Sequence, residues 1–455
     1  MISKYLPAPI QKLLQRFDEE LVNGSFVFFG TKIIGLLFNY LFLWWFVSEY
    51  NTTKWGFVTL CITIANIIGM ISILGFDIIV LKYISVLKSK LQYGEIKDIL
   101  IKSGINSFLI SGSIGLLFFV FAEFISGILF SNPFEAPWVR VIAIGIPAYG
   151  LYHINNSIFA GIKRMIWYGF FRNIVPFTFS LGIGAMLHYW IVPNYFPRFE
   201  QSGILILLSY FLILYLAVAY GFVLLNKQLK LRSTKRVPSI KYKSLYKESL
   251  PILVGTSMAL ILGSGDVLVL GILKSESVVG VYDIVGKLSL LMLLAIMSVN
   301  AILPAKFAEL YASNEMQKLK VLSFQSNRLI FWISSLLFIF MILVSPWILS
   351  LFSIETAEAA YLIFILLSAQ FVNTICGSNM VLLKMTDHHY FFRNLMIFAA
   401  IFNIGLNFIM IPNYGMVGAA VTTLLTTCLW NFWGVFYTYR KMNILMVHVP
   451  FRSLT

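Results

Sequence analysis

Charged residues are scarce in this chain, and acidic ones especially so. Only 12% of its 455 residues are charged, with 19 acidic side chains against 34 basic ones and a formal net charge of +15. Soluble domains average about 25% charged and about 45–50% apolar residues, whereas 59% of this chain is hydrophobic. The composition therefore excludes an ordinary soluble enzyme and a disordered chain. The three cysteines, Cys61, Cys376 and Cys428, all lie in apolar runs, which excludes a disulfide framework and predicts free thiols.

Long apolar runs take the place of the missing charge. About 20 consecutive apolar residues are needed to cross the hydrocarbon core of a bilayer as a helix. The sequence contains twelve such runs, at 25–47, 57–80, 104–127, 138–160, 167–190, 203–226, 248–272, 281–304, 329–352, 360–383, 392–411 and 416–438. We therefore predict an all-α polytopic membrane protein with twelve transmembrane helices.

The basic residues are distributed very unevenly between alternate loops. The segments on one side of the predicted membrane hold 28 Lys and Arg residues, and those on the other side hold 4. Cytoplasmic loops collect Lys and Arg, so both termini are predicted to be cytoplasmic, and the net positive charge needs no nucleic-acid partner. Residues 1–24 are predicted to form either an amphipathic helix on the cytoplasmic surface or a solvated leader, and residues 439–455 a cytoplasmic tail.

The two halves of the chain match each other at a nearly constant offset. Six short matches occur in order, with offsets that fall only from 225 to 219 residues; one pairs residues 170–173 with 391–394. Each half has six spans, so both halves enter the membrane in the same direction, as a parallel repeat. This predicts two six-helix lobes, at 25–226 and 248–438. The basic segment 227–247 between them is interpreted either as a solvated linker or as a site of attraction to anionic lipid headgroups.

Catalytic and cofactor motifs are missing. The Gly280 to Lys287 stretch has five residues between its glycines instead of four and lacks the Ser or Thr of a phosphate-binding loop. The five histidines are scattered without the spacing of metal ligands. We therefore predict no catalytic residue, no metal site and no cofactor, and we expect that the chain is not an enzyme.

Several local strings resemble a known group of exporters. They are Asp266 with the apolar residues 267–271, then 279–282, 286–288 and 413–420. In this order on a twelve-span frame, the chain resembles the multidrug/oligosaccharidyl-lipid/polysaccharide (MOP) exporter superfamily, and within it the polysaccharide (O-antigen, Wzx-type) flippases.

The resemblance implies a central cavity between two lobes and alternating access in a bacterial or archaeal cytoplasmic membrane. The implied cargo is a polyprenyl-diphosphate-linked oligosaccharide, moved from the inner to the outer leaflet with a proton or sodium ion as a possible coupling ion. The implied protein is a functional monomer, alone or with polysaccharide assembly proteins. A cation-coupled multidrug or metabolite exporter of the same fold stays open as the alternative.

Ionisable residues inside the predicted spans are candidate functional residues because they are costly in lipid. Lys32 lies in the first span and Asp77 near the inner end of the second. Asp266 and Lys287 lie at matching depth in the seventh and eighth spans, and their counterparts in the repeat are uncharged. We expect Asp266 and Lys287 to be neighbours, either as a neutralising ion pair or as a pair linked to proton coupling or gating.

Two arginines and a set of amides complete the candidate site. Arg172 and Arg393 occupy equivalent positions of the repeat, where they either anchor at headgroups or, with Lys32, hold the diphosphate of the cargo. The amides either form hydrogen bonds between helices or line a polar cavity; they are Asn155, Asn156, Gln370, Asn373, Asn403 and Asn407.

Overall fold

The computed structural model describes residues 19–130, 135–195, 203–229, 232–238, 241–300, 303–354 and 357–447. Every regular element in these ranges is helical, so the all-α expectation is confirmed. Most of the amphipathic segment predicted over 1–24 and the end of the tail predicted over 439–455 lie outside the described residues.

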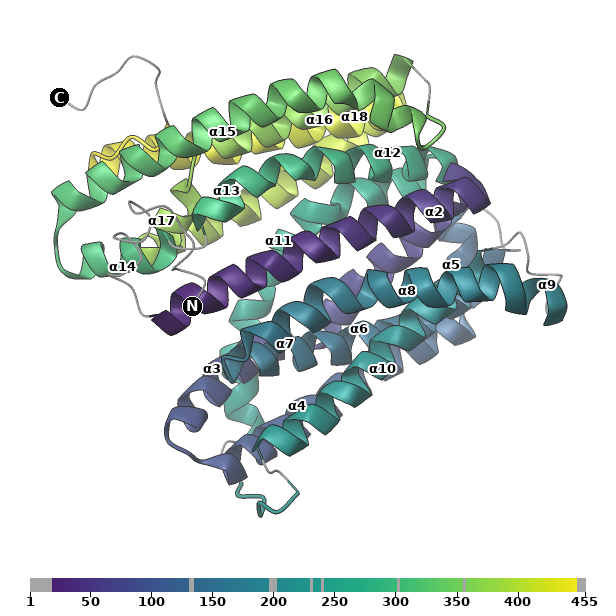
Figure 1. The fold of residues 1–455 in the computed structure, drawn as a ribbon, viewed down its shortest axis with the longest axis horizontal. Coiled ribbons are helices and arrows are strands. Elements are labelled where there is room, and N and C mark those ends of the chain that lie inside the picture. The colour runs from purple at the N-terminus through teal and green to yellow at the C-terminus, as the bar shows by residue number, and fades with distance from the viewer. Residues whose placement is uncertain are drawn as a thin grey trace. The chain divides into compact units, whose positions relative to one another are not determined.

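The chain divides into two compact units at Leu260 and Ile261, within the helix α11 (Tyr242–Leu273). Helix α6 is central in the first unit and packs against α2, α3, α4 and α10 (Figure 1). The elements of this unit before α11 are α2 (Glu19–Ser72), α3 (Phe76–Ser89), α4 (Tyr93–Val120), α5 (Ala122–Leu129), α6 (Ala136–Gly161), α7 (Met165–Gly169), the π-helix η3 (Phe170–Ile174), α8 (Val175–Met186), the π-helix η4 (Leu187–Ile191), α9 (Val192–Tyr195) and α10 (Ile204–Leu229).

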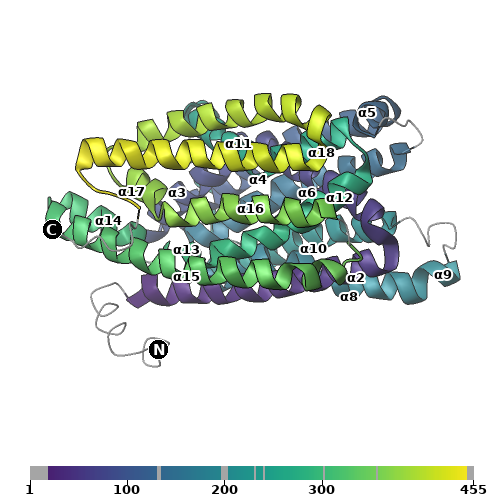
Figure 2. The same ribbon diagram turned by 90° about the horizontal axis from the view of Figure 1, so that it is seen from above.

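Helix α16 is central in the second unit, between α15 and α18 (Figure 2). The elements after α11 are α12 (Glu276–Ser289), the 3₁₀-helix η6 (Leu290–Met292), α13 (Leu293–Asn300), α14 (Leu303–Ala312), α15 (Met316–Ser350), α16 (Ala357–Ile375), α17 (Asn379–Met385) and α18 (His389–Met442).

Close packing of α4 on α6 depends on small residues. Gly115 of α4 faces the backbone of α6, and a Cβ atom added there would lie 2.6 Å from the carbonyl oxygen of Ala143. Small residues let helix backbones approach closely in membrane proteins, where lipid is as apolar as the helices themselves. The same unit leaves large apolar side chains exposed on its outer surface, such as Leu116 and Phe124, which suits contact with lipid tails.

The described helices do not match twelve separate spans one for one. Seven of them are long and apolar enough to cross a membrane. Two of these contain two expected spans each: α2 bends at Asn51 (φ 70°) and α18 at Gly415 (φ 55°). Asn51 also caps the second segment of α2, because its Oδ1 accepts a hydrogen bond from the Lys54 N–H at 3.1 Å. The expected eighth span, 281–304, is divided into short helices from α12 onward.

Candidate functional site

A buried carboxylate lies in the second unit. Asp266 of α11 is only 8% exposed. Its Oδ1 accepts a hydrogen bond from Nδ2 of Asn407 at 2.6 Å, and its Oδ2 accepts one from the Tyr282 hydroxyl at 2.9 Å and another from the Thr423 hydroxyl. The carboxylate therefore lies among uncharged polar groups, and no ion pair reaches it from the residues described.

The polar cluster continues along α18, on both sides of its bend at Gly415. Nδ2 of Asn407 also donates to Oδ1 of Asn403 at 3.1 Å, and Nδ2 of Asn403 donates to the Thr426 hydroxyl at 3.4 Å. Oδ1 of Asn407 is buried, and it has no hydrogen-bond partner among the described residues. Asp266, Asn407 and Thr423 thus present several oxygen atoms inside the unit. Oxygen atoms are the groups that hard cations prefer as ligands.

The expected ion pair between Asp266 and Lys287 is wrong. The Lys287 ammonium instead forms its ion pair with Asp283, on the same helix α12. The reason is geometric, because residues four apart on a helix are neighbours. Lys287 finds an acid on its own helix, whereas Asp266 is surrounded by uncharged donors from α12 and α18.

Three of the expected charged residues share one region of the first unit. Lys32 comes from α2, Asp77 from the first turn of α3, and Arg172 from the π-helix η3. Nδ2 of Asn173, the residue after Arg172, donates to the hydroxyl of Thr31, the residue before Lys32, at 3.3 Å, so η3 and α2 bring the two cations together. Asp77 is the single acid among these three residues, so together they carry a net positive charge.

The position of Arg172 follows from Pro176. Proline has no N–H to donate to the carbonyl four residues earlier, which is that of Arg172. The helix widens here into η3, and such π-helical segments are frequent at functional sites. The exposed guanidinium lies 5.6 Å from the centroid of the Tyr168 ring and donates to its hydroxyl at 2.6 Å.

Arg393 has a similar local setting in the second unit. Its exposed guanidinium lies 5.5 Å from the centroid of the Tyr390 ring and donates to Oδ1 of Asn394. Each arginine of the repeat thus lies over a tyrosine about one turn earlier, which holds its head group in place. A clamp made by both arginines together would need groups from both units, and it stays a prediction.

The expected amides have different surroundings. Asn155 and Asn156 are buried in α6, while Gln370 and Asn373 of α16 are half-buried. Asn373 accepts a hydrogen bond from Asn431 at 3.4 Å. Of these amides, Asn407 and Asn403 contribute to the cluster around Asp266.

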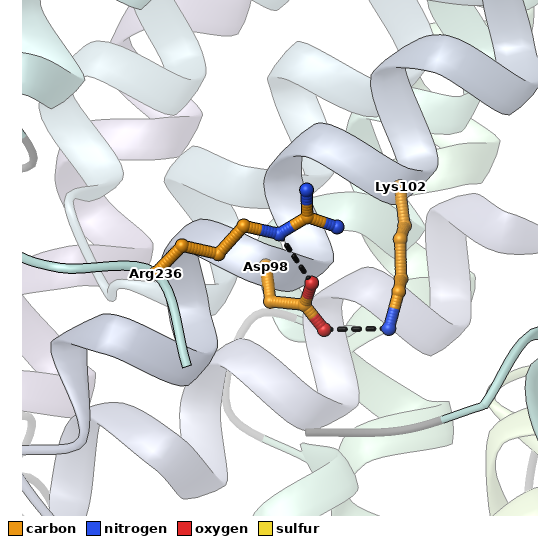
Figure 3. Close-up of polar contacts among 3 residues, drawn as sticks. All are labelled: Asp98, Lys102 and Arg236. Atoms are coloured by element: carbon orange, nitrogen blue, oxygen red, sulfur yellow. Dashed lines mark hydrogen bonds and ion pairs between the residues drawn. The ribbon is translucent and has the colours of Figure 1, made fainter. Parts of the chain in front are cut away.

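Sequence reasoning missed the hydroxyls of Tyr282 and Thr423 at Asp266, and it missed a buried acid in the first unit. Asp98 of α4 contacts Lys102 and Arg236 (Figure 3). The sequence held one signal for the cluster around Asp266, namely two asparagines one helical turn apart in an apolar run, Asn403 and Asn407. Among the described residues, no group of three His, Cys, Asp or Glu side chains could hold a metal ion.

The fold is similar to that of solved MATE transporters. An inward-facing multidrug resistance MATE family transporter of the MOP superfamily matches 92% of this chain and 98% of its own, with a TM-score of 0.72 and 14% identity. A MOP superfamily transporter from Pyrococcus furiosus, described with a binding pocket of reverse polarity, matches 94% of this chain and 96% of its own, with a TM-score of 0.65 and 12% identity. The outward-facing form of a multidrug resistance MATE family transporter matches 93% of this chain and 96% of its own, with a TM-score of 0.65 and 12% identity. No curated protein matches the chain by sequence.

Residues 21–308, more than half of the chain, match the family described as "Polysaccharide biosynthesis protein". The chain belongs to this family. Family and fold together define a polysaccharide biosynthesis family protein with the all-helical fold of solved MATE transporters.

Proposed function

We propose that the protein is a flippase for a polyprenyl-diphosphate-linked oligosaccharide, such as an O-antigen or another surface polysaccharide unit. It would move this cargo from the inner to the outer leaflet by alternating access of its two lobes, 25–226 and 248–438. The observation that carries the proposal is the family match over residues 21–308, on a fold similar to that of known exporters. Polysaccharide biosynthesis needs such a step wherever sugars are assembled on one leaflet and used on the other.

The charge of the first unit supports an anionic cargo. Lys32 and Arg172 lie in one region and outnumber Asp77, the acid near them. An arginine head group matches the geometry of phosphate oxygens, whereas lysine acts as a point charge. We assign Lys32 and Arg172 to the diphosphate, with Arg393 as the matching group of the second lobe.

The buried carboxylate of the second unit supports ion coupling. We assign Asp266 as the group that takes up a coupling proton or sodium ion, with Asn407 and Thr423 beside it. Such a carboxylate is costly inside a membrane, and taking up a cation offsets that cost. Asp77 of the first lobe is the second acid that we assign to coupling, although it is not the repeat counterpart of Asp266.

A second candidate function is export of a cationic drug or metabolite by the same fold. It is favoured by the likeness to multidrug resistance MATE family transporters. Such a cargo is better matched by an acidic or apolar cavity than by Lys32 and Arg172. The two functions therefore differ in the charge of the cargo that binds.

Twelve crossing segments are proposed. Helices α2 and α18 each supply two of them, one before and one after the bend. We place both termini in the cytoplasm of a bacterial or archaeal cell, and the protein in its cytoplasmic membrane as a functional monomer. Surrounding lipids, and polysaccharide assembly proteins where present, are the proposed partners.

Labelling of single cysteines tests this topology. Cysteines at Asn51 and Ser353 should react with a membrane-impermeant maleimide from outside intact cells, and cysteines at Ser233 and Asn314 only after the membrane is opened. The uneven distribution of Lys and Arg, 28 against 4, is the reason. An externally reactive Ser233→Cys variant would contradict the orientation.

Reconstitution into liposomes tests the function itself. The protein should move a short-chain polyprenyl-diphosphate oligosaccharide across the bilayer, as measured by its accessibility to an added glycosidase. A cationic dye is the matched alternative cargo in the same vesicles. Transport of the dye without transport of the lipid-linked sugar would favour the second candidate function.

A further inference from the structure

One face of α4 carries a row of polar side chains that the proposed function does not use. Asp98, Lys102 and Asn106 follow each other at intervals of four residues, so they lie on the same side of the helix. All three are buried, and Asp98 is fully so. Such a row inside a largely apolar unit needs partners, because buried polar groups are costly when unpaired.

The partners come from the basic segment between the two predicted lobes. Oδ1 of Asp98 accepts a hydrogen bond from Nε of Arg236 at 2.7 Å, and its Oδ2 contacts Nζ of Lys102 at 2.6 Å (Figure 3). The carboxylate thus lies between a cation from its own helix and one from residue 236, which is 138 residues away in the sequence. This buried acid offsets part of the positive charge of the segment where Arg236 contacts α4.

Backbone contacts fix the same segment. The Val237 N–H donates to the carbonyl oxygen of Gly94 at 3.1 Å, and Nζ of Lys97 donates to the carbonyl oxygen of Thr234 at 3.0 Å. We call the described residues 232–238 the strap. The strap is therefore held by its main chain at two points as well as by the Arg236 side chain.

The row on α4 continues into the first turns of α11. Nζ of Lys102 lies 5.7 Å from the centroid of the Tyr242 ring, and the Tyr246 hydroxyl donates to Oδ1 of Asn106. Tyr246 also packs on Phe76 of α3, with ring centroids 5.3 Å apart. Successive polar groups of α4 thus bind successive positions of the chain, from the strap into α11.

Glu248 adds a contact between α11 and α3. Its carboxylate accepts hydrogen bonds from Lys82 at 3.0 Å and from the Tyr83 hydroxyl at 2.6 Å. The beginning of α11 is therefore bonded to both α3 and α4 of the first unit.

We propose that the strap is a built part of the N-terminal unit, clasped to α4 by Asp98, and that the strap and the first turns of α11 stay with this unit throughout transport. Asp98 is then a positioning residue that sets where α11 begins. The segment is not the free solvated linker that its basic composition suggests.

Limited proteolysis in nanodiscs tests the clasp independently of any cargo. The strap holds Arg232, Lys235 and Arg236, so trypsin should cut it quickly if it were free. The Arg236→Gln variant should be cleaved after Lys235 at least about tenfold faster than the wild type, because one charge-assisted hydrogen bond no longer holds the closed form. The Arg236→Lys variant should recover part of the protection.

Two further variants keep this test decisive. Asp98→Asn should behave like Arg236→Gln; if Asp98→Asn fails to fold, Arg236→Gln decides. Glu123→Gln is the matched control, because it removes an acid from an exposed ion pair with Arg140 in the same unit, and it should leave strap cleavage unchanged. Equal cleavage of wild type and Arg236→Gln would overturn the clasp.

A crosslink tests whether the strap stays docked during transport; this arm rests on the proposed function. In a variant without Cys61, Cys376 and Cys428, cysteines at Lys97 and Thr234 are joined by a bismaleimide that contains a reducible disulfide. Transport of the lipid-linked sugar should continue with the link in place. Loss of transport that returns on reduction would show that the strap must undock, and would overturn the proposal. Absence of transport before crosslinking would instead count against the proposed function, and the proteolysis result would stand.

Discussion

Replacing Asp266 with asparagine should abolish ion-coupled transport while leaving the protein in the membrane. The carboxylate accepts hydrogen bonds from Asn407, Tyr282 and Thr423, and a neutral amide cannot replace its charge for a proton or sodium ion. Asparagine takes up no proton and offers no negative charge to sodium, so gradient-driven transport should fall to the level of protein-free liposomes. The measurement is translocation in liposomes with an imposed proton or sodium gradient.

Insertion of this variant should not suffer. A carboxylate in the middle of a membrane helix costs about 2.5–3.5 kcal/mol on insertion scales, and asparagine carries no charge. Loss of transport at an unchanged protein level would therefore point to a role in coupling. Unchanged gradient-driven transport by Asp266→Asn would contradict the assignment.

The neighbouring ion pair provides the control. Lys287 binds Asp283 and not Asp266, so Lys287→Gln should not rescue Asp266→Asn. The double variant Asp283→Asn/Lys287→Gln removes both charges of that pair together, so it should retain more activity than Lys287→Gln alone. Rescue of Asp266→Asn by Lys287→Gln would restore the pairing that the sequence suggested.

Removing the positive charge of the first unit should weaken cargo binding. Lys32→Ala and Arg172→Ala each delete a cation from the region where the diphosphate is proposed to bind. At about 1.5–3 kcal/mol for each charge-assisted hydrogen bond, each change should weaken binding of a soluble polyprenyl-diphosphate analogue by about 10- to 100-fold. Titration calorimetry on the protein in nanodiscs measures this directly.

The chemistry of arginine refines this test. Arg172→Lys keeps the charge but loses the planar fork, so it should fall between the wild type and Arg172→Ala. Arg140→Ala is the control, because it removes an exposed arginine that is paired with Glu123. Arg393→Ala asks whether the second lobe takes part in binding. Unchanged binding by Lys32→Ala, Arg172→Ala and Arg393→Ala together would remove the diphosphate site.

The sequence predicted the helices well because lipid leaves a chain few choices. Without water, every backbone N–H and carbonyl must be paired within the segment, and a helix does this. The spans expected at 203–226 and 329–352 lie largely within α10 and α15. The limits of single helices were harder to predict, since Asn51 and Gly415 turn the chain without ending the helical run.

The partners of the charged residues depended on the tertiary structure. Apolar composition shows that a segment avoids water, but it does not show which distant segment packs against it. Asp266 meets Thr423 across 157 residues, and Asp98 meets Arg236 across 138. The sequence paired Lys287 with Asp266 only because both lie at a similar depth in their predicted spans. In the structure Lys287 forms its ion pair with Asp283 on its own helix.

The sequence by itself determined the helical class and the excess of positive charge, and it predicted the repeat, because each follows from composition and order along the chain. Only the tertiary structure decided that Asp266 lies among hydroxyls and amides, that η3 places Arg172 beside α2, and that the strap is bound to α4. The physical reason is that a buried charge must be paired or solvated by whatever group the fold brings near. Which groups the fold brings together depends on the packing of helices that are far apart in the sequence.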